Sequence, residues 1–238
     1  MLLLRLFKNN RTAGLVLVIL ITVLTHLVSF IHPPGQVEWQ DMPLYDLIFG
    51  PLNRFPLLSG FMAILIHLLI ALILIRINLH YALIEERTYM PAIFYLLIAN
   101  AFPLLHQVNP MLIGSLFYLI SFRMLIDTHD EPADTYRIFN ASLVFFLGTL
   151  FYARLIWFFP VLLIILLTLR SLTLREFIYP FVAGIFTGLL LFTYYWVVEG
   201  AGWKLASVLK ENLSFTRCHH PIHFSMFVYI GYICLLYT

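Results

Sequence analysis

Charged side chains are scarce in this chain. Lys, Arg, Asp and Glu make up 11% of its 238 residues, whereas hydrophobic residues make up 62%. A water-soluble protein of this length needs more polar surface than that to cover its apolar residues. The shortage of charge therefore excludes an ordinary soluble domain and indicates an integral membrane protein. The net charge of +2, without any basic run, gives no reason to expect nucleic acid as a partner.

Cysteine is rare as well, and the sequence motifs of several enzyme classes are missing. The two cysteines, Cys218 and Cys234, form neither a CxxC pair nor a disulfide framework. No phosphate-cradling glycine loop, HExxH pair, nucleophile elbow or nucleotide-binding fingerprint occurs in the sequence. The sequence therefore does not support ATP hydrolysis by this chain, and it leaves the cofactor unknown.

Long apolar runs are what the chain has in abundance. About 20 apolar residues in a helix cross a hydrocarbon core of about 30 Å. We expect an all-α, polytopic helical bundle of about eight membrane helices in a single integral membrane domain over 1–238. The expected spans are 13–31, 55–77, 91–105, 111–126, 138–152, 155–169, 177–198 and 224–238. The last run barely crosses a bilayer, which suggests truncation at the C-terminus.

The charges between the runs predict the orientation of the bundle. With a cytoplasmic N-terminus, Lys and Arg are more frequent on the inner loops than on the outer ones, as the positive-inside rule requires. The basic residues before the first run resemble the start of a signal peptide, but no small-x-small cleavage site follows them. We therefore expect an uncleaved first span.

The first external loop holds the candidates for catalysis. Glu38, Asp41 and Asp46 lie close in sequence to Trp39, before the second span. Carboxylates beside an aromatic ring at a membrane surface can bind a cation, orient a sugar hydroxyl or act as a general base. The same residues can form a solvated acidic loop whose path is fixed by prolines. We prefer this second interpretation, because no spacing in the loop is diagnostic of catalysis.

Histidines provide a candidate metal site. His219 and His223 have the i, i+4 spacing that lets two imidazoles bind a transition metal from one helical face, although Pro221 opposes a regular helix there. Together with Glu38 or Asp41, histidines on the outer side could form a metal or proton site. The histidines expected there are His26, His32, His106, His219, His220 and His223. Interfacial histidines without any ligand are the commoner situation.

Polar groups inside the runs form a third set of candidates. His67 lies near the middle of the second span, where an ionisable side chain is costly and suggests a function, although a neutral histidine can simply bond a neighbouring helix. Arg154 lies near the end of a run, so we expect it to extend to the headgroups, the alternatives being an anionic lipid or a polar cavity. Gly184 and Gly188 have the spacing typical of close helix packing.

Several segments between residues 75 and 198 resemble a family of bacterial multi-spanning membrane proteins. The segments that carry the resemblance are Glu86–Tyr95, Asn109–Pro110, Phe139–Ser142, the pattern from Gly148 to Tyr152, Leu174–Phe177 and Phe192–Tyr195. The resemblance implies a multi-spanning envelope protein of the bacterial inner membrane and carries no catalytic residues. A topological likeness to membrane-embedded glycosyltransferases that use lipid-linked sugars rests on Glu38, Asp41 and Asp46.

These observations lead to three functional hypotheses. The first is an accessory or structural component, without enzymatic activity, of a system that assembles envelope glycan or lipid. Its partners would be the lipid bilayer and other envelope membrane proteins. The second is a glycosyltransferase that acts on a lipid-linked sugar with an external carboxylate as base. The third is a small transporter with His67 or Arg154 in its path.

Overall fold

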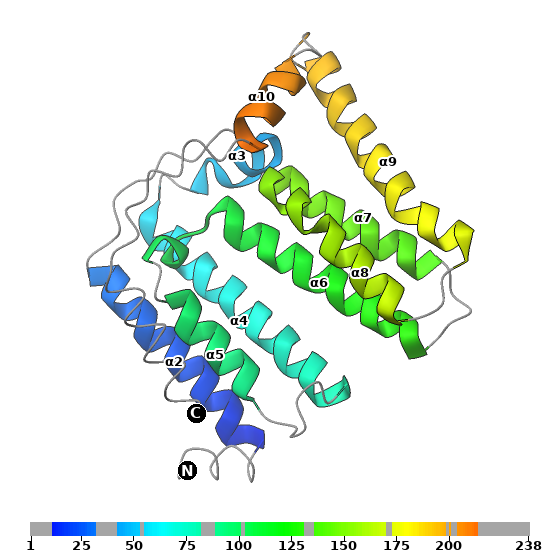
Figure 1. The fold of residues 1–238 in the computed structure, drawn as a ribbon. Coiled ribbons are helices and arrows are strands. Elements are labelled where there is room, and N and C mark those ends of the chain that lie inside the picture. Colours follow the sequence, from blue (N-terminus) through cyan, green and yellow to red (C-terminus); the bar gives the residue numbers. More distant parts are fainter. Residues whose placement is uncertain are drawn as a thin grey trace. The chain divides into compact units, whose positions relative to one another are not determined.

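Helix is the only regular secondary structure in the part of the chain that the structure describes, as the sequence predicted. The computed structural model describes residues 11–31, 42–52, 55–81, 89–100, 103–130, 136–169, 173–198, 200 and 204–213. The α-helices (Figure 1) are α2 (Arg11–Ile31), α3 (Pro43–Phe49), α4 (Pro56–Tyr81), α5 (Met90–Asn100), α6 (Pro110–Asp130), α7 (Tyr136–Phe151), α8 (Phe159–Leu169), α9 (Leu174–Val198) and α10 (Lys204–Leu213). Two 3₁₀ helices, η2 (Pro103–His106) and η3 (Ala153–Phe158), precede α6 and α8.

Three of the described helices are long and apolar enough to cross a membrane. They are α4, most of α6 (Pro110–Thr128) and most of α9 (Leu174–Val197). The 26 residues of α4 extend about 39 Å at 1.5 Å per residue, which exceeds a hydrocarbon core of about 30 Å. Shorter apolar helices lie at Gly14–Leu27, Met90–Asn100, Tyr136–Phe151 and Ala153–Leu169. The all-helical fold is thus confirmed for the described residues, three of whose helices could cross a membrane, whereas the number of eight spans stays a prediction.

Helix α2 has buried polar side chains among those that face its neighbours, and large apolar side chains on its exposed face. Thr22 and His26 are 0% and 1% exposed, while Leu20 and Leu24 are 51% and 55% exposed. The buried hydroxyl of Thr22 donates a hydrogen bond to the Val18 carbonyl at 2.8 Å, so its polarity is satisfied within the helix. This arrangement suits a helix whose outer face contacts lipid.

The described residues form two compact units. The first contains α2, α4, α5, η2 and the first residues of α6. The second contains α3, the rest of α6, α7, η3, α8, α9 and α10. The two units use different means to bring their helices together.

In the first unit, α2, α4 and α5 pack against one another (Figure 1). Their buried contacts include Val18, Ala71 and Leu96. Gly14 lets the ring of Tyr89 approach α2 closely, since a Cβ added at this glycine would lie 2.5 Å from Cδ2 of the ring. Small residues at such contacts allow membrane helices to pack by van der Waals contact, where lipid provides no hydrophobic driving force.

The expected span 91–105 is not one continuous helix. Helix α5 ends at Asn100, and η2 begins at Pro103, whose ring disfavours helical backbone at the preceding residue. Beyond η2, Asn109 caps α6 by accepting a hydrogen bond from the Leu112 amide at 2.7 Å, and Pro110 takes the first helical position, which suits its missing N–H. The Val108 amide, in the same stretch, is satisfied by the Ser59 hydroxyl of α4 at 3.0 Å.

In the second unit, aromatic side chains of α7 pack within a cluster of buried hydrophobic residues. Phe145 and Phe146 contact each other edge to face and both contact Phe159 at the start of α8. Helix α9 packs against α7 at Gly184, where an added Cβ would lie 2.7 Å from the tip of the Phe146 ring. At Gly188, no atom of the described residues lies within 4 Å of the corresponding position. The expected close packing is therefore confirmed at the first glycine only.

Candidate functional site: a buried histidine cluster

Three histidines from three elements of the first unit meet in its interior. His26 of α2, His67 of α4 and His106 of η2 form what we call the histidine cluster. The ring centroid of His26 lies 5.3 Å from that of His67 and 4.6 Å from that of His106. His26 and His67 are 1% and 0% exposed, and His106 is also buried. An apolar chain thus places three imidazoles together and away from solvent.

The hydrogen bonds of His67 identify its tautomer. Its Nε2 lies 3.0 Å from the backbone carbonyl of Leu105, which can only accept, so Nε2 carries the proton. In the neutral ring Nδ1 is then an acceptor, and the hydroxyl of Tyr95 donates to it at 2.9 Å. Both nitrogens of a neutral His67 are therefore satisfied, one by α5 and one by η2.

His26 has the opposite tautomer and an unused nitrogen. Its Nδ1 donates to the backbone carbonyl of Thr22 at 2.9 Å, which leaves Nε2 as the acceptor in the neutral ring. Among the described residues, no hydrogen-bond partner reaches this buried Nε2. A lone pair inside the cluster is therefore available to a donor or to a cation.

Asn100, the last residue of α5, adds a second buried acceptor beside the turn. Its Nδ2 donates to the Leu96 carbonyl at 2.6 Å, which distinguishes the amide nitrogen from the oxygen. Its Oδ1 is buried, and no described residue donates to it. The backbone of Asn100 also forms a hydrogen bond with His106, which joins the end of α5 to the cluster.

Local sequence explains how the cluster is assembled. On α2 the buried positions recur every fourth residue and end with Thr22 and His26, so both polar groups face the interior. On α4, His67 lies on the same buried stripe as Ala63 and Ile70. His106 reaches the cluster because α5 stops early and the chain turns through η2.

His67 and Arg154, the two candidates predicted within the apolar runs, have different surroundings in the structure. His67 lies in the cluster beside His26, packed and hydrogen-bonded. Arg154 is partly buried in the second unit, and its Nε donates to the carbonyl of Asn212 at 3.1 Å, near the C-terminal end of α10. A basic side chain suits the C-terminal end of a helix, where it can donate to the last carbonyls. The expected extension of Arg154 to the headgroups stays a prediction.

Of the remaining sequence candidates, the structure describes Asp46. Asp46 is exposed on the short helix α3, and its carboxylate accepts a hydrogen bond from the Met42 amide at 2.7 Å, so it caps its own helix. Glu38, Asp41, His219 and His223 lie outside the described residues, as does the expected span 224–238. The carboxylate site and the C-terminal histidine site stay predictions.

The sequence did not predict that His26 and His106 meet His67, because both were assigned to the histidines on the outer side of the membrane. The signal for His26 was the spacing of Gly14, Val18, Thr22 and His26, which puts the small and polar residues of an apolar run on one stripe. No comparable pattern predicted His106. Its position depends on the turn between α5 and α6.

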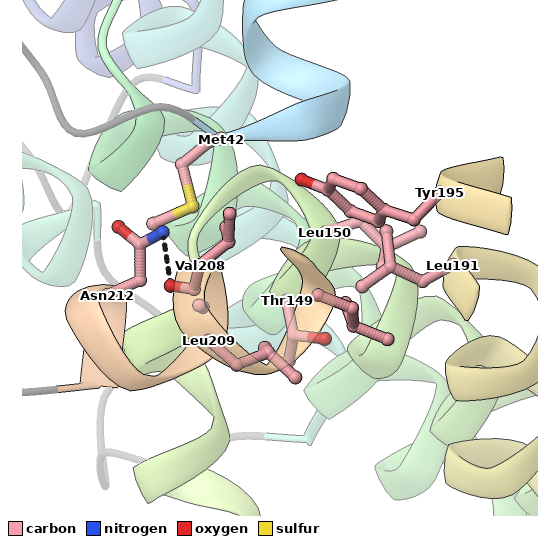
Figure 2. Close-up of a pocket in the computed structure, with 10 residues that line it drawn as sticks. Met42, Thr149, Leu150, Leu191, Tyr195, Val208, Leu209 and Asn212 are labelled. Carbon is pink, nitrogen blue, oxygen red and sulfur yellow. Dashed lines mark hydrogen bonds between the residues drawn. The ribbon is translucent and has the colours of Figure 1, made fainter. Parts of the chain in front are cut away.

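The second unit contains a small cavity, which Figure 2 shows. Leu150 of α7, Leu191 and Tyr195 of α9, and Leu209 and Asn212 of α10 are among the side chains that line it. Its volume of about 20 Å³ is room for one water molecule, since about 10–15 Å³ is the minimum. This cavity is too small for a sugar or a lipid headgroup.

Among the described residues, fold and site together define an all-helical protein with three helices that could cross a membrane and with a buried cluster of three imidazoles. No three His, Cys, Asp or Glu side chains among the described residues are already placed to hold a metal ion. No family model, curated protein or solved structure matches the chain.

Proposed function

We propose that this chain is a small multi-pass transporter of a bacterial inner membrane, with the histidine cluster as its transport site. The observation that carries the proposal is the convergence of His26, His67 and His106 at the turn between α5 and α6. Ionisable side chains within membrane helices are costly, and they commonly mark substrate or ion pathways. The N-terminus would be cytoplasmic, in accordance with the distribution of Lys and Arg.

The turn between α5 and α6 supports a transport site over a purely structural one. His67 is close to the middle of α4, and its bond to Leu105 brings η2 to that level of the helix. Irregular backbone at such a depth is tolerated where protein buries it or where it borders a site. In many transporters, interrupted helices supply backbone groups and helix ends to the bound solute. The first unit has this combination of a short helix, a turn and convergent polar groups.

The test is whether water-borne reagents reach the cluster during operation. In a background with Cys218→Ser and Cys234→Ser, Thr22→Cys places a thiol one turn from His26. Ser142→Cys is the matched control, since both parent side chains are 0% exposed and bond to a carbonyl four residues earlier at 2.8 Å. The measurement is the rate of reaction with a quaternary-ammonium methanethiosulfonate in membrane vesicles.

We expect the thiol of the Thr22→Cys variant to react much faster than that of the Ser142→Cys variant. A transport cycle opens the site in a state whose population is about 0.1–10%. The thiol of the control becomes accessible only through unfolding, which at about 5 kcal/mol populates less than about 0.1% of molecules. Equal, slow rates in both variants would contradict transport and favour a static core.

The two other hypotheses stay predictions. A glycosyltransferase would need Glu38, Asp41 or Asp46 at a cavity of membrane depth, and the exposed Asp46 does not favour it. An accessory role in envelope assembly would need a partner surface, for which α9 offers an exposed apolar face. That face suits lipid equally well.

A further inference from the structure

We propose that the histidine cluster binds a divalent first-row transition-metal ion through Nε2 of His26, the side-chain oxygen of Asn100 and the imidazole of His106. The proposal rests on the proposed transport function, for which it names the substrate class. It concerns residues of α2, α5 and η2, and not the histidine pair predicted near the C-terminus.

The first argument is an excess of acceptors. His26 Nε2 and Asn100 Oδ1 are both buried acceptor atoms to which no described residue donates. A buried acceptor without a donor costs about 1–3 kcal/mol, so two of them close to the same turn need an occupant. Only a donor or a cation can satisfy them.

The second argument is the direction of α5. The C-terminal end of a helix has partial negative charge and carbonyls without partners in the helix. Helix α5 is 11 residues long and ends at Asn100, directly before the turn that carries His106. The helix end therefore favours a positive occupant over an anion or a neutral polar molecule.

The third argument distinguishes a transition metal from other cations. Imidazole nitrogen suits zinc, copper, iron and nickel, whereas alkali and alkaline-earth ions prefer oxygen ligands. Two imidazoles bound to one tetrahedral ion have ring centres about 5 Å apart, given metal–nitrogen bonds of about 2.0–2.1 Å. The centroids of His26 and His106 are 4.6 Å apart. Rotation of the rings without movement of the helices can therefore aim both at one ion.

The hydrogen bond of the second ring nitrogen of His26 matches that of a metal-ligating histidine. A ligating histidine usually donates its other ring N–H to a carboxylate or a backbone carbonyl, which fixes the ring. His26 makes such a bond to the Thr22 carbonyl at 2.9 Å. Both nitrogens of His67 are already hydrogen-bonded, one to Tyr95 and one to Leu105. His67 is therefore a positioning residue, whose ring centroid lies 5.3 Å from that of His26 and supports that ring. The protein would supply only part of the coordination shell of the ion, which suits an ion that has to be released again during transport.

The experiment measures binding of Co²⁺ and Zn²⁺ to the full chain, purified in detergent after EDTA treatment. His219, His220 and His223 are replaced by Ala throughout, so that any ion held by those residues is removed. Equilibrium dialysis gives the stoichiometry and the affinity, and the visible absorption of Co²⁺ reports nitrogen and oxygen ligation. We expect a single ion per chain.

Three variants and one control test the assignment. His26→Gln should lower the affinity by more than about 100-fold, and His67→Gln by about 10-fold with the same Co²⁺ spectrum, as for a residue that only orients a ligand. Asn100→Asp should raise the affinity, because a carboxylate replaces an amide oxygen. His80→Gln, at the exposed end of α4, should change nothing. If the His26→Gln variant fails to fold, the expected gain of affinity in the Asn100→Asp variant still tests the proposal.

Absence of binding at 100-fold excess of either ion would overturn the metal proposal, as would binding that is unaffected by both His26→Gln and Asn100→Asp. Tight binding of ammonium in place of the metals would overturn it as well. A reactive thiol in Thr22→Cys without metal binding leaves transport intact and refutes the metal. Metal binding with an unreactive thiol in Thr22→Cys leaves the metal site intact and refutes transport.

Discussion

The hydroxyl of Tyr95 donates a hydrogen bond of 2.9 Å to Nδ1 of His67. The phenol is the donor in this pair because Nε2 already donates its proton to the Leu105 carbonyl, which can only accept. The carbonyl thereby decides which nitrogen of His67 is the acceptor, and the hydroxyl satisfies that nitrogen and helps to fix the orientation of the ring next to His26.

Tyr95→Phe should therefore destabilise the protein. The ring stays in place while Nδ1 of His67 loses its donor. Hydrogen bonds between membrane helices contribute about 0.6–2 kcal/mol, and we expect a loss in this range. Unfolding in SDS, monitored by circular dichroism, measures it. Tyr136→Phe serves as the control, since Tyr136 is 73% exposed and should lose nothing. Equal stability of the two variants would show that the bond to His67 is not formed in the membrane.

His67 could be singled out from the sequence, whereas its neighbours could not. Depth within an apolar run is visible in the sequence, and it identified His67 because an ionisable group is costly there. His26 lies nearer the end of its run, and His106 lies between two runs, where histidines are unremarkable. Their meeting depends on the angle at which helices pack, which hydropathy does not determine.

At the scale of elements, the two glycines of α9 have different surroundings, although their spacing in the sequence suggests the same packing role for both. Gly184 faces Phe146, and Gly188 faces open space. Gly184→Ala should cost about 1–3 kcal/mol, because the new methyl group collides with a ring that Phe145 and Phe159 hold on other sides.

Gly188→Ala should be neutral or should stabilise α9 by up to about 1 kcal/mol through helix propensity. The same SDS unfolding measurement applies to both variants. If Gly188→Ala proves the more damaging change, then α9 uses that face for a helix contact absent from the described part of the chain.

Hydropathy located most elements of the fold but not their interruptions. The ends of α4 and α9 lie within a few residues of the predicted runs, because length and apolar content are enough to define a membrane helix. The runs 91–105 and 155–169 each conceal a 3₁₀ turn. Such turns hardly change the average hydropathy, although the first of them carries His106 into the cluster.

The whole molecule has an outer surface that is apolar where a soluble protein would be polar. Ile185, near the middle of α9, is 64% exposed. In lipid, Lys at the centre of a helix costs about 2.5–3.5 kcal/mol. In water, a change at an exposed position usually costs less than about 0.5 kcal/mol.

Ile185→Lys should therefore lower the yield of folded protein in the membrane fraction, as measured by size-exclusion chromatography after extraction in detergent. Tyr136→Lys provides the control at an equally exposed site, at the first residue of α7. If both variants are recovered at the yield of the parent chain, then α9 does not face lipid.

The wide separation of the three histidines in sequence has a consequence for synthesis. His26 leaves the ribosome 80 residues ahead of His106 (106 − 26 = 80). At about 5–20 residues per second, this delay lasts roughly 4–16 s. During that interval α4 can already bring His67 to His26, but the third imidazole is still missing. The cluster is therefore completed only when the turn after α5 has been synthesised and reaches the helices that are already inserted.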